Sequence, residues 1–170
     1  EASKMVRENG YAAHFVLAGG LDHYNPLAYS PEEIESLIKD TPVVWRGKIN
    51  DMPRMYSCSN IIVYPSFYKE GIPKVLLEGA ASGRAIITTD HPGCREAVEN
   101  GVNGILVPVK NAKSLAQAIQ RLLDDKNLRR HMGQNSRRIA QEKFDVNLIN
   151  NQTLEVYRDI LKTKNERVSS

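Results

Sequence analysis

Short apolar runs alternate with amphipathic segments along most of this chain, and this alternation limits the possible folds more than any other feature. Five such runs are predicted to be strands, and two of them, residues 60–66 and 84–90, are predicted to be buried strands. Continuous apolar strands separated by helices are typical of βαβ units, in which helices cover both faces of a parallel sheet. The sequence therefore predicts an α/β fold with a doubly wound parallel sheet. The expected strands lie within residues 14–20, 41–47, 60–66, 84–90 and 101–109.

The segments between these runs carry helix signals. Ser30 is followed by Pro31 and Glu33, which is the pattern of an N-cap with a capping box. After the last strand the pattern changes to helices alone, so we expect a helical C-terminal extension. The other expected helices cover about 51–57, 72–83, 92–100, 111–122, 127–142 and 145–162.

The order of elements at the start of the chain is unusual for such a sheet. The first residues have a helical pattern and the first strand follows them, whereas a Rossmann-like unit opens with a strand. We expect the first strand of the fold to be missing, with Glu1 at a fragment edge; a genuine leading helix is the alternative. We assign residues 1–162 to one domain and 163–170 to a polar tail.

Composition excludes several classes of protein. With 41% hydrophobic residues the chain can bury a core. No apolar run reaches the roughly 18–20 residues of a membrane span. The two cysteines, Cys58 and Cys94, cannot form a disulfide framework or a four-ligand zinc site, which favours a reducing cytoplasm.

The charge is unevenly distributed along the chain. Residues 1–108 hold 10 Lys and Arg against 13 Asp and Glu, and residues 109–170 hold 13 against 7. The basic excess suits either solvated helix faces or peripheral contact with an anionic membrane at its cytoplasmic face. Aromatic residues make up only 6% and none lies between the basic ones, so nucleic acid is not an expected partner.

Candidate binding residues follow three of the predicted strands. Ligands of open parallel sheets bind beyond the carboxyl ends of the strands, at helix N-termini. The first two candidate sites are Gly19 with Gly20 and Gly47 with Lys48. The third is the segment 65–79, which is the most informative of the three.

Segment 65–79 combines two acids with a helix N-terminus. Glu70 lies in the loop, Pro73 begins the helix and Glu78 follows about a turn and a half later. Carboxylates suit polyols because each oxygen accepts hydrogen bonds in fixed directions. With the diphosphate in the anion site, one acid would accept hydrogen bonds from the hydroxyls of a sugar and the other from those of a ribose. The amides expected to be free for the diphosphate are those of Gly71, Ile72, Lys74 and Val75.

Lys74 departs from the usual placement of charges in a helix. It lies in the first turn, where the macrodipole disfavours a cation by roughly 0.3–1 kcal/mol. Such departures are expected at functional sites, although a lysine that simply points into solvent explains the position equally.

Segment 65–79 resembles the donor-binding signature of the retaining glycosyltransferases of family 4, which have the GT-B fold. Their pattern is Glu, seven residues and Glu, with Gly-x-Pro after the first acid, and it occurs here between Glu70 and Glu78. The flanking stretches LAGG, VVWRGKINDMPRMYSCSNIIVYPS and GRAIITTDHPGCREAVENGVNGILVPVKNAKSLAQAIQRLLDD are similar too, so the resemblance covers nearly the whole chain.

The resemblance implies a function and a set of roles. It implies retaining transfer of a hexose or N-acetylhexosamine from a nucleotide diphosphate sugar, a UDP sugar by preference, to a lipid-linked saccharide during bacterial capsule, exopolysaccharide or O-antigen synthesis. No metal or other cofactor is implied. Glu70 would contact the reacting sugar and Glu78 the ribose. The diphosphate and sugar would lie against the backbone from Gly71 to Leu76, a stretch that includes Ile72, Pro73, Lys74 and Val75. The base would lie against Gly47 and Lys48, beside Gly19 and Gly20.

Two departures from the family pattern bear on this reading. Gly79 replaces the usual alanine after the second acid, which is compatible with a close contact there. The basic residues with which the family clamps the diphosphate, and its acceptor-binding domain, would precede Glu1, so the chain alone is expected to be inactive.

Two other classes of protein are alternatives to a glycosyltransferase. A regulatory or degenerate GT-B module would bind a nucleotide without transferring sugar, but the presence of both acids argues against degeneracy. A nicotinamide-dependent oxidoreductase would have the motif G-x-G-x-x-G after its first strand, and the first visible strand is followed by LAGGLDHYN instead.

Overall fold

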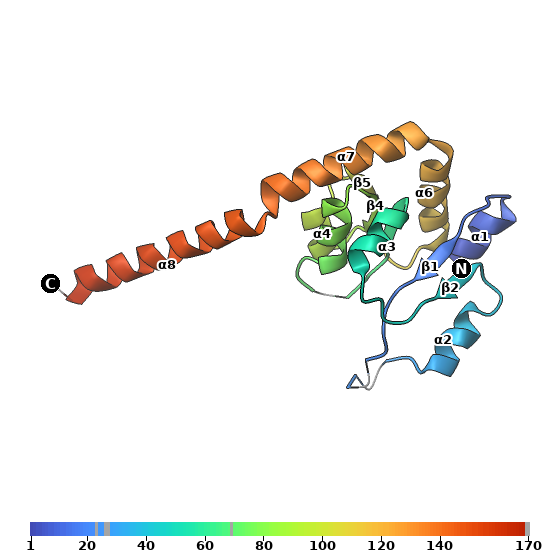
Figure 1. The fold of residues 1–170 in the computed structure, drawn as a ribbon, viewed down its shortest axis with the longest axis horizontal. Helices are drawn as coiled ribbons and strands as arrows, with labels where there is room; N and C mark the ends of the chain where they lie inside the picture. The colour runs from blue at the N-terminus through green and yellow to red at the C-terminus, as the bar shows by residue number, and fades with distance from the viewer. Residues whose placement is uncertain (23, 26–27, 69, 169–170) are drawn as a thin grey trace.

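The computed structural model describes residues 1–22, 24–25, 28–68 and 70–168, and it confirms an α/β fold with parallel strands (Figure 1). Two short strands, β1 (Phe15–Leu17) and β2 (Val43–Trp45), pair with each other. The remaining three strands form a second sheet with β4 at its centre. Every pairing is parallel, and these strands are β3 (Ile61–Tyr64), β4 (Ala85–Thr89) and β5 (Gly104–Val107).

The sheet differs from the prediction in being divided, because β1 and β3 are not hydrogen-bonded to each other within the described residues. In the doubly wound strand order, the place between these two strands belongs to the first strand of the fold. The β1 strand is not buried on both faces, since Val16 and Leu17 remain 45% and 43% exposed.

Eight helices are described, and their starts follow the predicted signals. Ser30 and Glu33 form the complete capping box, while Asp51 and Asn111 accept hydrogen bonds from the amides of Arg54 and Ser114. Their bounds are α1 (Ala2–Glu8), α2 (Pro31–Ile38), α3 (Met52–Cys58), α4 (Lys74–Ala81), α5 (Pro92–Ala97), α6 (Ala112–Asp124), α7 (Lys126–Lys143) and α8 (Val146–Val168).

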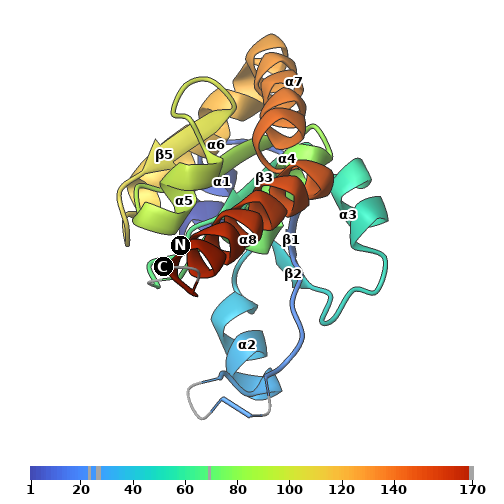
Figure 2. The same cartoon turned by 90° about the vertical axis from the view of Figure 1, so that its left-hand side faces the viewer.

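Helices cover both faces of the β3–β5 sheet, and β4 is buried along its whole length. Ile87 points into a cluster that contains Val6 of α1 and Ile119 of α6. Its neighbour Ile86 points the opposite way, into a cluster with Leu76 of α4. The alternation follows from the two-residue period of a strand. In both views α2 lies far from α7, on the side of the molecule where β2 is found (Figures 1 and 2).

The C-terminal helix departs from the prediction. The chain is helical to Val168, whereas a frayed tail is expected after about residue 162; residues 169–170 lie outside the described chain. A helix propagates through polar residues with fair helix propensity once it has been nucleated. α8 projects from the body of the molecule, and its side chains Val156, Ile160 and Leu161 remain more than half exposed (Figure 1).

Candidate nucleotide-sugar site

The loop after β3 ends in a helix N-terminus that no side chain caps. Pro73 occupies the N-cap position of α4, and it has no side-chain oxygen with which to accept from the first amides. The amides of Gly71, Ile72, Lys74 and Val75 make no hydrogen bond within the described residues. These four donors and the helix dipole form a site suited to an anion.

One of the predicted backbone donors already has a partner within the chain. The amide of Leu76 donates to the carbonyl of Pro73 at 3.0 Å, and the Leu76 side chain is fully buried in the core. Leu76 therefore anchors α4 and has no free donor for a ligand. Pro73 has no amide hydrogen, so its contribution is the fixed backbone that begins the helix.

Glu70 is held in place by two hydroxyl groups. Its Oε1 accepts hydrogen bonds from the Tyr64 hydroxyl at 2.8 Å and from the Ser66 hydroxyl at 3.2 Å. Its Oε2 has no partner within the described part of the chain. One carboxylate oxygen thus fixes the side chain, and the other is available to a ligand.

The loop that carries Glu70 is attached to the central strand. Thr88 donates its hydroxyl to the Tyr64 carbonyl at 2.6 Å, and the neighbouring Thr89 donates to the Ser66 carbonyl. Both threonines are buried in β4. These bonds join the start of the loop to the buried central strand of the sheet.

Glu78 also has two partners. The Tyr56 hydroxyl donates to Oε2 at 2.8 Å, and Lys74 Nζ lies 3.4 Å from Oε1. Lys74 is therefore not a lone cation: it pairs with Glu78 one turn along α4, in the less favourable orientation in which the base precedes the acid. The Lys74 side chain remains 87% exposed, so this ion pair contributes little to stability.

The two tyrosines stay protonated next to the acids. Burial, and then the hydrogen bond to Glu78, raises the pKa of Tyr56 far above its usual value of 10.0. Burial and the hydrogen bond to Glu70 raise the pKa of Tyr64 in the same way. Both hydroxyls therefore remain donors near neutral pH, which leaves Glu70 and Glu78 to act as acceptors.

Helix α5 packs against the backbone of the loop at Gly93. A Cβ at Gly93 would lie 2.2 Å from the Gly71 carbonyl oxygen and 2.6 Å from that of Glu70. Real Cβ atoms do not approach backbone this closely, so only glycine allows α5 to pack here. Gly93 thereby sets the position of the backbone on which the anion site depends.

Four predicted residues come together at the carboxyl ends of β1 and β2. The Gly19 amide donates to the Gly47 carbonyl at 2.9 Å, and a Cβ at Gly20 would lie 3.2 Å from Lys48 Cβ. Gly47 has φ +60°, a left-handed conformation that favours glycine. Trp45 Nε1 donates to the Gly19 carbonyl at 2.9 Å and fixes this pair of turns.

Several residues of the site were not singled out by the sequence. Tyr56 and Tyr64 are among them, because a sequence pattern does not show which tyrosine hydroxyl reaches a carboxylate. Lys110 was also missed: it has φ +56°, and its Nζ lies 4.6 Å from the centre of the exposed Phe67 ring. Both residues line an open hollow of about 400 Å³ at the carboxyl edge of β3–β5.

The part of the chain that the structure describes contains no cluster of three or more His, Cys, Asp or Glu side chains that could hold a metal ion. None of the described helices combines the length and the apolarity that crossing a membrane requires. Both cysteines are free thiols, Cys58 on the surface and Cys94 in the core.

Comparison with known proteins gives matches that agree with this geometry. The family model described as "Glycosyl transferases group 1" matches residues 1–125. N,N'-diacetylbacillosaminyl-diphospho-undecaprenol alpha-1,3-N-acetylgalactosaminyltransferase of Campylobacter jejuni is 36% identical over 162 residues, which is 95% of this chain and 40% of that protein. UDP-Gal:alpha-D-GlcNAc-diphosphoundecaprenol alpha-1,3-galactosyltransferase of Escherichia coli is 29% identical, over 96% of this chain and 42% of that protein.

Solved structures show the same fold. Sucrose-phosphate synthase from Thermosynechococcus elongatus matches with a TM-score of 0.83 and 28% identity, covering 95% of this chain and 42% of that one. The chain thus spans about two fifths of the length of each of these three proteins. It corresponds to one Rossmann-like half of a GT-B fold.

Proposed function

Because the chain belongs to the group 1 glycosyltransferases, we propose that it is the donor-binding half of a retaining enzyme that takes its sugar from a UDP sugar. The observation that carries the proposal is the arrangement around α4. Glu70 and Glu78, each held by a tyrosine hydroxyl, lie on either side of an uncapped helix N-terminus.

The arrangement suits the three parts of a nucleotide sugar. The free amides of the loop and of α4 would hold the diphosphate, whose negative charge the helix dipole favours. The free oxygen of Glu70 would accept from hydroxyls of the transferred sugar, and Glu78 would accept from the ribose. The turns that contain Gly19 and Gly47 would lie against the base.

The proposed reaction moves a hexose or N-acetylhexosamine with retention of its anomeric configuration. The acceptor hydroxyl would attack on the face from which the diphosphate leaves, and the leaving phosphate would take the proton. The chain's own part is to fix the diphosphate and the sugar, and to place the charge of Glu70 where positive charge develops on the sugar ring.

The names of the relatives support the acceptor class. The similar enzymes of Campylobacter jejuni and Escherichia coli are named for diphospho-undecaprenol acceptors, and the second is also named for a UDP donor. We propose a lipid-linked saccharide acceptor for the enzyme that contains this chain, in bacterial polysaccharide assembly. The acceptor would be bound by a second half, so this chain alone would not transfer sugar.

The donor can be identified by direct titration of the chain. UDP is expected to bind more tightly than NAD, with the same affinity in magnesium and in EDTA, because amides and not a metal ion would neutralise the diphosphate. Calorimetry with each nucleotide in both buffers measures this. Tighter binding of NAD, or a strict magnesium requirement, would reject the proposal.

Glu78→Gln is expected to raise the donor KM of the enzyme by about tenfold and to leave kcat within about twofold. The ribose does not change during the reaction, so its contact with Glu78 contributes equally to the ground state and the transition state. Loss of a charged hydrogen-bond partner is worth roughly 1.5–3 kcal/mol. Steady-state kinetics at saturating acceptor give both constants.

The matched control is Glu35→Gln, which removes the same charge from an exposed position on α2. It should leave both constants unchanged. If Glu78→Gln lowered only the melting temperature and left the donor KM as it was, Glu78 would be a structural acid paired with Tyr56.

A further inference from the structure

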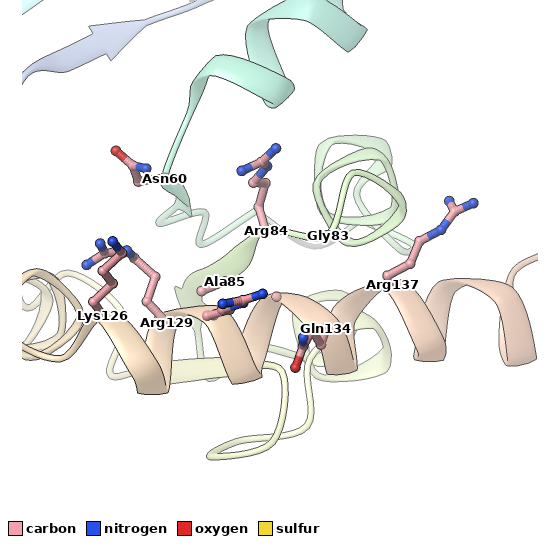
Figure 3. A pocket seen from close by; sticks show the side chains of 10 residues that line it. Asn60, Gly83, Arg84, Ala85, Lys126, Arg129, Gln134 and Arg137 are labelled. Carbon is pink, nitrogen blue, oxygen red and sulfur yellow. The ribbon is translucent and has the colours of Figure 1, made fainter.

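A basic hollow lies at the edge of the sheet opposite to the proposed donor site. It has a volume of about 500 Å³ and is formed where α7 passes the beginning of β4 (Figure 3). Asn60 precedes β3 and Arg84 precedes β4, whereas Glu70 follows the carboxyl end of β3. The hollow is therefore separated from the donor loop by the length of the strands.

Cationic side chains dominate this hollow, and no acidic residue lines it. None of its five cations forms an ion pair within the described residues. The acids next in sequence are engaged elsewhere: Asp124 accepts from the Tyr11 hydroxyl at 2.7 Å, and Asp125 accepts from the Leu128 amide. The five cations are Arg84, Lys126, Arg129, Arg130 and Arg137.

The arginines are fixed in position without being neutralised. Arg129 Nη1 donates to the Leu122 carbonyl at the end of α6, and Arg137 Nη1 donates to the Ala81 carbonyl at the end of α4, at 2.7 Å. A guanidinium has five N–H donors, so each keeps donors for a ligand. Arg84 Nε is buried and has no hydrogen-bond partner within the described chain.

The position of these cations does not help the helix that carries them. Lys126 and Arg129 lie in the first turn of α7, where the positive end of the helix dipole disfavours them, and no acid lies in that turn. Arg130 follows directly and lines the same hollow. Cations gathered in this way repel one another, and an anion bound between them would relieve that repulsion.

The wall of the hollow is rigid because two glycines meet there. A Cβ at Gly133 would lie 2.3 Å from the Gly83 carbonyl oxygen, so α7 packs directly on the turn that leads into β4. Lys126, Arg129 and Arg137 extend from α7 on the side where Arg84 lies (Figure 3). The cations therefore come from two elements whose spacing is fixed by backbone contact.

We propose that this basic hollow binds a phosphate-bearing ligand. Guanidinium groups match phosphate oxygens with paired hydrogen bonds, and four of the five cations are arginines. No aromatic side chain lines the hollow, so there is no platform on which a base could stack. The ligand is recognised by its phosphate, which either a lipid headgroup or a small free phosphate compound can supply.

The site is tested by titrating the ¹⁵N-labelled chain with inorganic pyrophosphate. Amide shifts of Gly83, Arg84 and Gly133 report on the basic hollow, while those of Gly71 and Ile72 report on the donor loop, so the two sites are read separately. Saturable shifts at the first three amides are expected. Shifts confined to the donor loop would overturn the proposal.

Paired charge reversals show whether pyrophosphate binds specifically to the hollow or is attracted by the overall positive charge of this part of the chain. Lys126→Glu with Arg130→Glu changes two cations of the hollow that no described hydrogen bond ties to the protein, and should weaken pyrophosphate binding there at least about tenfold. The control, Lys113→Glu with Arg121→Glu, makes the same charge change on exposed positions of α6. Its Kd for pyrophosphate should stay within about twofold of that of the unchanged chain. Equal losses in both pairs would overturn the proposal, and circular dichroism checks that each variant folds.

The source of the phosphate is identified by competition. A lipid headgroup is supported if the chain binds phosphatidylglycerol vesicles but not phosphatidylcholine vesicles. Pyrophosphate should then displace the chain from the vesicles, and the variant with Lys126→Glu and Arg130→Glu should not bind them. Binding of pyrophosphate without vesicle binding supports a free phosphate compound. If neither binds, or if single-stranded RNA binds the hollow more tightly than either, the proposal is wrong.

Discussion

Glu70→Gln is expected to lower kcat of the enzyme by about one to two decades while the donor KM changes by less than about threefold. The free oxygen of Glu70 would face the sugar ring, where positive charge develops as the diphosphate leaves. A carboxylate there stabilises the transition state more than the ground state, so its loss appears in kcat. The expected size follows from roughly 1.5–3 kcal/mol for a charged hydrogen-bond partner.

Two further variants make this test specific. Tyr64→Phe keeps the charge of Glu70 but removes the hydroxyl that donates to Oε1 at 2.8 Å. It should lower kcat less than Glu70→Gln does, because the Glu70 carboxylate is kept but is less firmly held in position. The double variant should be no slower than Glu70→Gln alone, because both changes act on one group. If Glu70→Gln and Glu78→Gln gave the same kinetic profile, the proposed division of roles would be wrong.

Gly93→Ala is expected to weaken UDP binding by at least about tenfold, although residue 93 does not belong to the binding loop. The new methyl group would lie 2.2 Å from the Gly71 carbonyl oxygen and 2.6 Å from that of Glu70, so either the loop or α5 must move. Overpacking of this kind typically destabilises a fold by about 1–3 kcal/mol. Calorimetric titration with UDP measures the loss of affinity.

Gly133→Ala provides the matched control. Its methyl group would meet the Gly83 carbonyl oxygen at 2.3 Å, a clash of the same kind at the opposite edge of the sheet. We expect a similar fall in melting temperature with an unchanged Kd for UDP in the folded fraction. If both alanine variants weakened UDP binding equally, the loss would come from general destabilisation and not from the loop.

Sequence reasoning was most successful where local rules decide the structure. The capping box at Ser30 and the caps at Asp51 and Asn111 act within three residues, so they can be read from the chain. The parallel order of the strands follows from apolar runs separated by helices. The two acids can be proposed from the sequence because a loop acid, a helix start and a helical acid form a recognisable spacing, and their binding roles stay a prediction.

The parts that were missed depend on contacts between distant segments. Tyr56 reaches Glu78 across 22 positions, and nothing at either residue specifies that approach. The hydrogen bond between the Leu76 amide and the Pro73 carbonyl depends on the tightness of the first turn of α4, which residue types do not specify. The sequence shows the basic hollow only as an excess of charge after residue 109, since Arg84 joins it from the turn before β4 through tertiary packing.

The division of the strands into two sheets has a consequence for the affinity with which the chain would bind a whole nucleotide. The turns at Gly19 and Gly47 belong to one hydrogen-bond network, and the loop at Glu70 belongs to another. A nucleotide that reached from one network to the other would have to fit the spacing between them. If that spacing varied from molecule to molecule, only the fraction with the fitting spacing would bind, and the apparent Kd would be the intrinsic constant divided by that fraction. A strand paired between β1 and β3 would hold the two networks at one spacing, and would tighten nucleotide binding without touching the nucleotide.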